Sequence, residues 1–271
     1  MPVSRTSLRY AVNVSILFRE VPFLERFARV RAAGFGAVEF WWPAGEDLSV
    51  VRAAVREADL AVALINFDAG DMPAGDRGLL SDPDRCGRFR DNVPVALELA
   101  RDLGCRRLNA LVGLELAPGR RTEQLALAQE SVGWAADQAA AVGAEVLIEA
   151  VNTFENGPYL LSTTRDAATF VRSVGRANVK LQYDAYHMQR MEGNLVATLR
   201  EHIAEIGHVQ IADSPGRGEP GTGEINYPFV LAALAELGYG GYVGLEYAPT
   251  TAATEDSFAW LPEPARKERS A

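Results

Sequence analysis

Short apolar runs alternate with longer segments of helical periodicity along the whole chain, and this alternation is the feature that most limits its possible folds. Eight runs rich in Val, Ile, Leu and aromatic residues lie at residues 10–17, 37–42, 61–67, 107–112, 145–152, 179–186, 207–212 and 242–247. The segments between them, at residues 21–33, 48–58, 84–103, 122–142, 164–174, 195–203 and 227–237, have the spacing of helices with one apolar face. Repeated strand and helix units of this kind are typical of a parallel sheet covered by helices.

Eight units in 271 residues predict a single (β/α)8 barrel of the α/β class, which we expect to form one domain over residues 1–271. Glycines such as Gly104 and Gly238 stand where helices should end, which supports the count. The alternative is an open doubly wound sheet, which usually has a glycine-rich turn after its first strand. Here Val14-Ser-Ile-Leu-Phe follows instead. Residues 262–271 are polar and are expected to fray or to pack loosely.

The composition favours a globular protein whose partner is a small molecule. Hydrophobic residues make up 48% of the chain, which is enough for a large core. The formal net charge of −9 disfavours binding to nucleic acid or to an anionic membrane surface, because such binding is driven by Lys and Arg.

The two cysteines and the N-terminal sequence indicate where the protein resides. Cys86 and Cys105 form no Cys-x-x-Cys pair, so neither a disulfide framework nor a zinc-thiolate site is expected. No signal-peptide pattern and no run of 18 apolar residues occurs. We therefore expect an unprocessed cytoplasmic protein without membrane spans.

Four polar residues lie late in the last four apolar runs, where a barrel of this type carries its functional groups. They are Glu149, Asp184, Gln210 and Glu246. Each could merely satisfy local hydrogen bonds, but burying three carboxylates together is costly unless a cation is supplied. With the Gln210 carbonyl, the donors are all oxygen, which predicts Mg²⁺ or Mn²⁺.

Three more residues follow these candidates in the next loops and are expected to meet a substrate. They are Glu155, His187 and Arg217. The other two histidines have simpler interpretations: His202 lies in a predicted helix and is expected at the surface or in packing, and His208 is expected to form a hydrogen bond in the core.

Three long motifs carry a resemblance to a known family. They are Asn66-Phe-Asp-Ala-Gly-Asp-Met-Pro-Ala-Gly-Asp-Arg-Gly, Gln182-Tyr-Asp-Ala-Tyr-His-Met-Gln-Arg-Met-Glu-Gly and Gln210-Ile-Ala-Asp-Ser-Pro-Gly-Arg-Gly-Glu-Pro-Gly-Thr-Gly-Glu-Ile-Asn-Tyr. Through them the chain resembles, nearly end to end, the hydroxypyruvate isomerase family of xylose isomerase-like TIM barrels, close relatives of the 2-oxo-tetronate isomerases.

The resemblance implies that Glu149 and Glu246 are both metal ligands and the catalytic acid/base pair, with Asp184 and Gln210 completing the coordination. It implies proton transfer between hydroxypyruvate and tartronate semialdehyde through an enediolate, without an organic cofactor. Related ketose 3-epimerases carry histidine where this chain has Gln210, which makes a free sugar less suitable as the substrate.

Two positions of the first motif, Asn66 and Arg77, complete the expected substrate-binding residues. Arg217 could grip the substrate carboxylate, and Arg77 is a second candidate for that task. Aromatic residues 40–42 could exclude water from the site, or could simply be core packing.

Several functions remain open from the sequence. A 2-oxo-tetronate isomerase differs from the first interpretation by one carbon in its substrate, and a ketose 3-epimerase or a lyase would use similar proton abstraction. A non-catalytic sugar-acid-binding barrel belongs to another class. An abasic-site endonuclease would need a histidine-rich zinc site, and the chain has 3 histidines. A homodimer or higher homo-oligomer is a default expectation.

Overall fold

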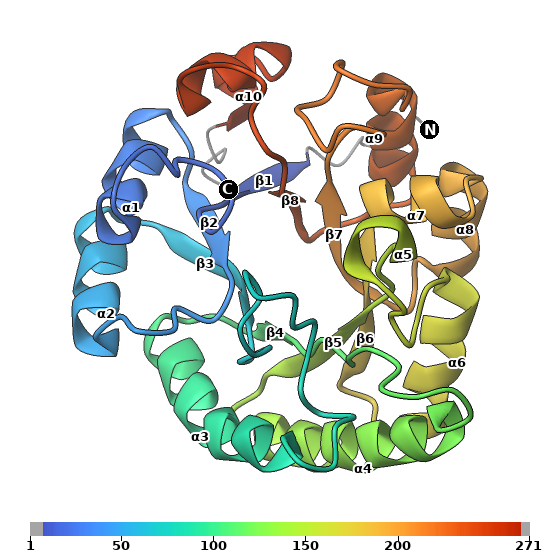
Figure 1. Ribbon diagram of the computed structural model, residues 1–271. Coiled ribbons are helices and arrows are strands. Elements are labelled where there is room, and N and C mark those ends of the chain that lie inside the picture. Colours follow the sequence, from blue (N-terminus) through green and yellow to red (C-terminus); the bar gives the residue numbers. More distant parts are fainter. Residues whose placement is uncertain (1–7, 267–271) are drawn as a thin grey trace.

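The computed structural model describes residues 8–266 and contains a closed barrel of eight parallel strands (Figure 1). Neighbouring strands pair in chain order, and β1 also pairs with β8, with Tyr10 opposite Val243. The strands are β1 (Arg9–Asn13), β2 (Ala37–Phe40), β3 (Ala61–Asn66), β4 (Arg107–Asn109), β5 (Glu145–Glu149), β6 (Val179–Asp184), β7 (Ile206–Ile211) and β8 (Tyr242–Leu245). The predicted (β/α)8 fold is confirmed, and the open-sheet alternative is excluded because β1 and β8 are paired rather than edge strands.

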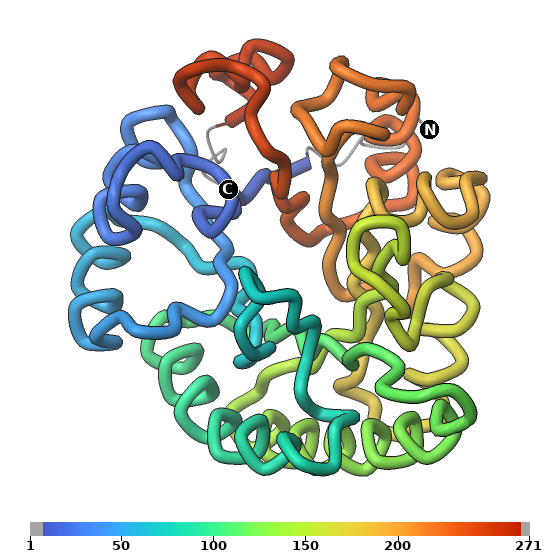
Figure 2. The backbone as a smooth tube through the Cα atoms, viewed as in Figure 1, coloured from blue at the N-terminus to red at the C-terminus, as the bar shows by residue number. Residues whose placement is uncertain are grey.

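All seven predicted helices are present on the outside of the barrel, each within two residues of its expected ends. They are α1 (Phe23–Ala32), α2 (Leu48–Glu57), α3 (Cys86–Asp102), α4 (Arg121–Ala140), α6 (Thr164–Val174), α8 (Leu195–His202) and α9 (Tyr227–Glu236). Figure 2 follows the chain around the barrel from blue to red. Four short helical elements were not predicted: α5 (Thr153–Asn156), α7 (Ala185–Met191), η1 (Thr254–Trp260) and α10 (Glu263–Arg266).

Helix α6 shows how local sequence sets these elements. The hydroxyl of Thr163 accepts a hydrogen bond from the backbone N–H of Asp166, which caps the start of the helix. Its buried residues, including Ala167, Phe170 and Val174, recur at three- and four-residue spacing and pack toward the sheet. Gly175 then ends the helix with a left-handed backbone conformation.

The strands end earlier than predicted, at polar residues that turn the chain. The run 179–186 was predicted as one strand, but β6 stops at Asp184, whose carboxylate accepts hydrogen bonds from the backbone N–H groups of Tyr186 and His187. This cap starts α7, so His187 lies on a helix rather than in a loop. In the same way β1 stops at Asn13, whose Oδ1 accepts from the N–H of Ser15.

The first part of the predicted loose tail forms a short helix. Helix α10 covers residues 263–266, and Arg266 donates hydrogen bonds to the backbone oxygens of Leu261, Phe258 and Ala33. These contacts tie this part of the tail to the barrel, whereas residues 267–271 lie outside the described part of the chain.

Cys86 and Cys105 are both free. None of the helices between residues 8 and 266 has the length and apolar character needed to cross a membrane.

Candidate active site

The three predicted carboxylates meet at the C-terminal end of the barrel. Glu149 is the last residue of β5, Asp184 is the last residue of β6, and Glu246 follows β8 directly. All three are buried, with 5%, 0% and 5% of their surface exposed. Electrostatic repulsion acts among them, since Glu246 and Asp184 both raise the pKa of Glu149.

Glu149 has a single side-chain hydrogen-bond donor among the described residues. The Nδ2 of Asn109, at the end of β4, donates to Glu149 Oε2 over 2.8 Å. The other oxygen, Oε1, lies 3.9 Å from the Nε2 of His187. Burial, followed by repulsion from Glu246 and Asp184, raises the pKa of Glu149 well above its usual range.

Asp184 uses one oxygen for the fold and leaves the other free. Oδ1 caps α7, while Oδ2 is buried and makes no hydrogen bond within residues 8–266. Oδ2 lies 3.6 Å from His187 Nε2. Burial raises the pKa of Asp184 despite the nearby positive charge of Arg217. A buried carboxylate oxygen without a partner is costly, so its position favours a cation as the missing partner.

Glu246 is held by three different donors. Asn13 Nδ2 and Trp41 Nε1 each donate to Oε1 over 2.8 Å, and Arg217 Nη2 donates to Oε2 over 2.6 Å. Burial is the largest cause that raises the pKa of Glu246, to about 7, with Arg217 opposing it. This carboxyl group can therefore exchange a proton near neutral pH.

Gln210 lies in a buried polar layer with Glu39, Gln182 and His208. Its Nε2 donates to Glu39 Oε1 over 2.6 Å, and its Oε1 accepts from Gln182 Nε2 over 2.5 Å. Glu39 also lies 2.7 Å from the Nε2 of His208, which confirms the core hydrogen bond expected for that histidine. Because a carboxylate in this position can only accept from an amide, the Glu39 contact fixes which way the Gln210 amide points.

Two carboxylates of the site are close enough to share a divalent cation. Ligand atoms of Glu149, Asp184 and His187 lie within 4.8 Å of one another, and two of the three are carboxylate oxygens. The role of His187 depends on which ring nitrogen carries the proton. Asn152 Nδ2 lies 2.7 Å from His187 Nδ1, and the Oδ1 of Asn152 is occupied by the backbone N–H of Glu155.

An amide nitrogen only donates, so His187 Nδ1 accepts and the proton of the neutral ring is on Nε2. In this arrangement Nε2 points its N–H toward the carboxylates and any bound substrate, and it has no lone pair for a metal. Burial, with the charges of Arg217, Arg77 and Arg190, lowers the pKa of His187 well below its usual range, so the ring is neutral at pH 7.

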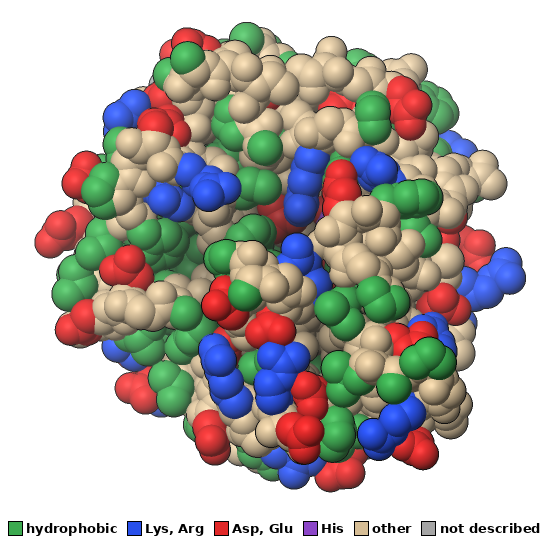
Figure 3. Space-filling model, in the orientation of Figure 1, with side chains coloured by type: hydrophobic (Ala, Val, Ile, Leu, Met, Phe, Trp, Pro, Cys, Tyr) green, Lys and Arg blue, Asp and Glu red, His purple; other side chains and the backbone are tan. Residues whose placement is uncertain are grey.

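A small cavity of about 70 Å³ opens above the carboxylates. It is lined by six of the predicted residues, Asn66, Arg77, Glu149, His187, Arg217 and Glu246, together with Trp41, Met72, Leu111, Val151 and Asn156. Figure 3 shows acidic and basic side chains gathered at the centre of this face. Asp184 and Gln210 are not among the lining residues. Glu155 does not line the cavity either. Its carboxylate accepts hydrogen bonds from the Tyr186 hydroxyl and from Arg190.

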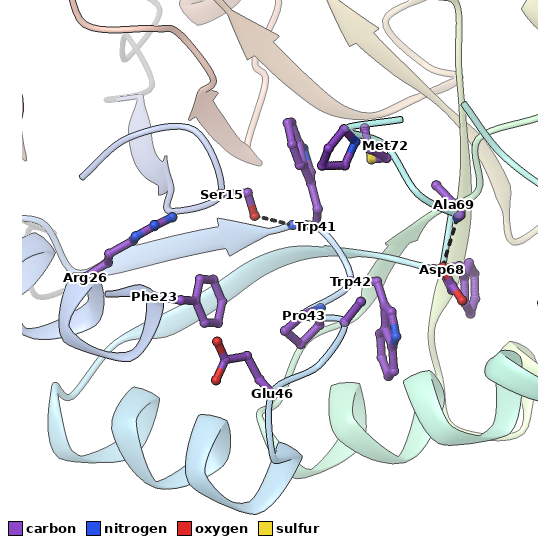
Figure 4. A pocket seen from close by; sticks show the side chains of 14 residues that line it. Ser15, Phe23, Arg26, Trp41, Trp42, Pro43, Glu46, Asp68, Ala69 and Met72 are labelled. Atoms are coloured by element: carbon purple, nitrogen blue, oxygen red, sulfur yellow. Dashed lines mark hydrogen bonds between the residues drawn. The ribbon is translucent and has the colours of Figure 1, made fainter. Parts of the chain in front are cut away.

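The three consecutive aromatic residues have separate roles. Phe40 is core, with its ring centroid 5.9 Å from that of Phe27. Trp41 donates to Glu246 and lines the cavity, so it belongs to the site. Trp42 lines a second, outer cavity of about 300 Å³. Trp41 and Met72 border both cavities, and Figure 4 shows them close together, with the Ser15 hydroxyl accepting from the backbone N–H of Trp41.

Sequence reasoning missed several residues that hold the site. Asn13 and Asn109 end β1 and β4, and Glu39 interrupts the apolar strand β2. Each of the three is a polar residue inside a predicted apolar run, but each stands in the first half of its run, whereas the predicted site residues were those late in their runs.

Comparisons with known proteins agree with this geometry. The model of the xylose isomerase-like TIM barrel family matches residues 27–263. Hydroxypyruvate isomerase from Escherichia coli is 42% identical, covering 94% of this chain and 98% of the relative. The 2-oxo-tetronate isomerase from Cupriavidus necator is 41% identical, covering 93% and 97%.

A crystal structure titled as a family 2 AP endonuclease from Brucella melitensis is also similar. It superposes with a TM-score of 0.89 at 40% identity and covers 94% of this chain and 98% of that one. Since the family model and the curated relatives both extend over most of the sequence, the chain is an isomerase that belongs to the hydroxypyruvate isomerase family of xylose isomerase-like TIM barrels.

Proposed function

We propose that the protein is a metal-dependent isomerase that interconverts hydroxypyruvate and tartronate semialdehyde, with Glu149 and Glu246 as its acid/base pair. The observation that carries this proposal is the pair of buried glutamates that line one small cavity, with the buried Oδ2 of Asp184, which has no hydrogen bond within residues 8–266, close by. Similarity to relatives named as hydroxypyruvate isomerases supports the choice of substrate.

Glu149, Asp184 and Glu246 would hold the metal, which we take to be Mg²⁺ or Mn²⁺. Gln210 remains a predicted fourth ligand, although its carbonyl oxygen already accepts a hydrogen bond from Gln182. When bound, the cation would act as a Lewis acid that stabilises negative charge on the substrate oxygens. It would also offset the repulsion that raises the pKa values of the carboxyl groups.

The reaction needs three proton movements, and the residues of the cavity can provide them. One glutamate removes a proton from C3 of hydroxypyruvate, which leaves an enediolate with its charge on the C2 oxygen. A proton returns to C2 from the same or the opposite glutamate, and the C3 hydroxyl proton moves to the C2 oxygen. His187 Nε2–H faces this region and would donate a hydrogen bond to the oxygen that gains charge.

The proposal predicts metal-dependent isomerisation that can be measured directly. The protein is stripped with a chelator, reloaded with Mn²⁺ or Mg²⁺, and incubated with hydroxypyruvate and, separately, with a four-carbon 2-oxo acid. We expect a product of unchanged mass only in the reloaded samples. Loss of water would identify a lyase instead, and activity that survives complete metal removal would contradict metal dependence.

A 2-oxo-tetronate isomerase is the second candidate, because relatives with that name are almost as similar. Its substrate has one more carbon and undergoes the same chemistry. The ratio of kcat/KM for the three- and four-carbon acids separates the two. An endonuclease activity, as named for the Brucella melitensis structure, fits the cavity less well. Such an activity is expected to need a histidine-rich zinc site, and His187 is the one histidine among the residues that line the cavity.

A further inference from the structure

Arg77 differs from Arg190 and Arg217, which also lie near the site, because it forms no ion pair with a carboxylate of the described residues. It lies in the loop between β3 and α3, lines the cavity, and forms no ion pair with any residue from 8 to 266. Arg217, on the same cavity, is paired with Glu246 over 2.6 Å. The positive charge of Arg217 is thus offset at the reacting end of the cavity, whereas that of Arg77 is not.

The hydrogen bonds of Arg77 leave one edge of its guanidinium group available. Nε donates to Asn156 Oδ1 over 2.6 Å, and Nη1 donates to the backbone oxygens of Met72 and Asp76 over 3.0 and 2.7 Å. A guanidinium group has five N–H donors, so these three bonds leave two, both on Nη2. Within the described residues, Nη2 has no hydrogen-bond acceptor.

Arg77 is therefore fixed before any ligand binds. Its loop is tight, because an added Cβ at Gly78 would lie 1.9 Å from the backbone oxygen of Leu111 and one at Gly70 would lie 2.3 Å from Asp76 Oδ2. A half-buried cation held by two backbone oxygens and an amide loses little freedom when an anion arrives, which favours binding.

We propose that Arg77, rather than Arg217, binds the substrate carboxylate and makes the enzyme select 2-oxo acids over uncharged ketoses. This inference rests on the proposed function, and it also sets the orientation of the substrate. The carboxylate lies at Arg77 Nη2, so C2 and C3 lie toward Glu149 and Glu246. A neutral sugar would leave the charge of Arg77 without a partner in a partly desolvated cavity.

The test uses the metal-loaded protein with Arg77→Gln, Arg77→Lys and, as a matched control, Arg85→Gln. Arg85 belongs to the same segment but forms ion pairs with Asp76 and Asp82 outside the cavity. Binding of D-glycerate is measured by calorimetry, because this acid has no carbonyl group to isomerise. Steady-state rates are measured with hydroxypyruvate and with dihydroxyacetone, its uncharged analogue.

We expect Arg77→Gln to weaken glycerate binding by about 10- to 100-fold, as for loss of a charged hydrogen bond. KM for hydroxypyruvate should rise by a similar factor, kcat should change less than about threefold, and kcat/KM for dihydroxyacetone should stay within about threefold. Arg77→Lys should recover part of the affinity, and Arg85→Gln should bind glycerate like the wild type.

Four outcomes would overturn the inference: a wild type that does not bind glycerate, an Arg77→Gln variant that binds it normally, an equal loss of kcat/KM for both substrates in Arg77→Gln, or an equal loss of glycerate binding in Arg85→Gln. Either of the last two would mean that Arg77 only orders its loop. Failure of the proposed function would give a different result from failure of this inference. Arg77-dependent glycerate binding without turnover of hydroxypyruvate or of dihydroxyacetone would refute the isomerase and keep the carboxylate site.

Discussion

Three hydrogen-bond donors around the buried carboxylate of Glu246 oppose the effects that raise its pKa. Asn13, Trp41 and Arg217 favour its charged form, while burial and the neighbouring acids favour the neutral form, and the pKa is about 7 as a result. This balance suits the proposed role of Glu246, in which it takes up and releases a proton in each turnover.

Replacing Glu246 with Gln should remove proton transfer and keep the size of the side chain. We expect kcat to fall by about 100-fold or more, the usual effect of losing a general acid or base. Glu236→Gln, on the exposed face of α9, is the control and should leave kcat unchanged. A loss below about threefold for Glu246→Gln, with the melting temperature preserved, would remove Glu246 from the catalytic pair.

Trp41→Phe should change how activity depends on pH. The indole N–H stabilises the charged form of Glu246, so its removal should raise the pKa of that carboxyl group further. The acidic limb of the kcat/KM profile should then move to higher pH. Trp42→Phe provides the comparison, since Trp42 lines only the outer cavity, and it should leave the profile in place. An unshifted limb in Trp41→Phe would contradict this role.

At the scale of elements, the sequence predicted all eight strands and seven helices but not where the strands end. The alternation of apolar runs is repeated along the whole chain, so it identifies the units reliably. Strand ends depend on single side chains, such as the Asp184 carboxylate that starts α7. The carboxylates were predictable because charge inside an apolar run is conspicuous. The Trp41 to Glu246 contact was not, since it joins residues 205 positions apart.

The strand β8 carries a glycine that the polar layer requires. A Cβ at Gly244 would lie 2.4 Å from Oε2 of Glu39, which is buried and held by His208 and Gln210. We expect Gly244→Ala to lower the free energy of unfolding by about 1–3 kcal/mol, as for overpacking of a core. Chemical denaturation measures this, with Gly240→Ala as the control because an added Cβ there meets nothing within 4 Å. Equal stability of the two variants would contradict the packing described.

At the scale of the whole molecule, the buried carboxylates couple stability to pH and, under the proposed function, to metal. Burial raises the folded-state pKa of Glu246 from 4.5 to about 7. The stability linked to this group is fully present below pH 4.5 and is lost as pH rises through 7, in total about 3 kcal/mol from the shift in pKa. The pKa values of Glu149 and Asp184 are also raised by burial, so these groups too lower the stability as the pH rises.

The metal-free protein should therefore melt several degrees lower at pH 8 than at pH 5.5 because of these groups. Added Mn²⁺ should raise the melting temperature more at pH 8, where the ligands are ionised. Glu149→Gln should reduce both effects. A metal-induced shift that is the same at both pH values and in this variant would place the cation elsewhere.

Proton NMR of hydroxypyruvate in D2O, with the metal-loaded protein, tests the central claim most directly. It follows the carbon-bound positions that Glu149 and Glu246 should deprotonate and reprotonate. We predict tartronate semialdehyde, with deuterium entering C2 of the product and C3 of the remaining substrate, and loss of both signals in Glu149→Gln, in Glu246→Gln and after metal removal. Neither product nor exchange from the wild type with metal bound would contradict the isomerisation of hydroxypyruvate at this site.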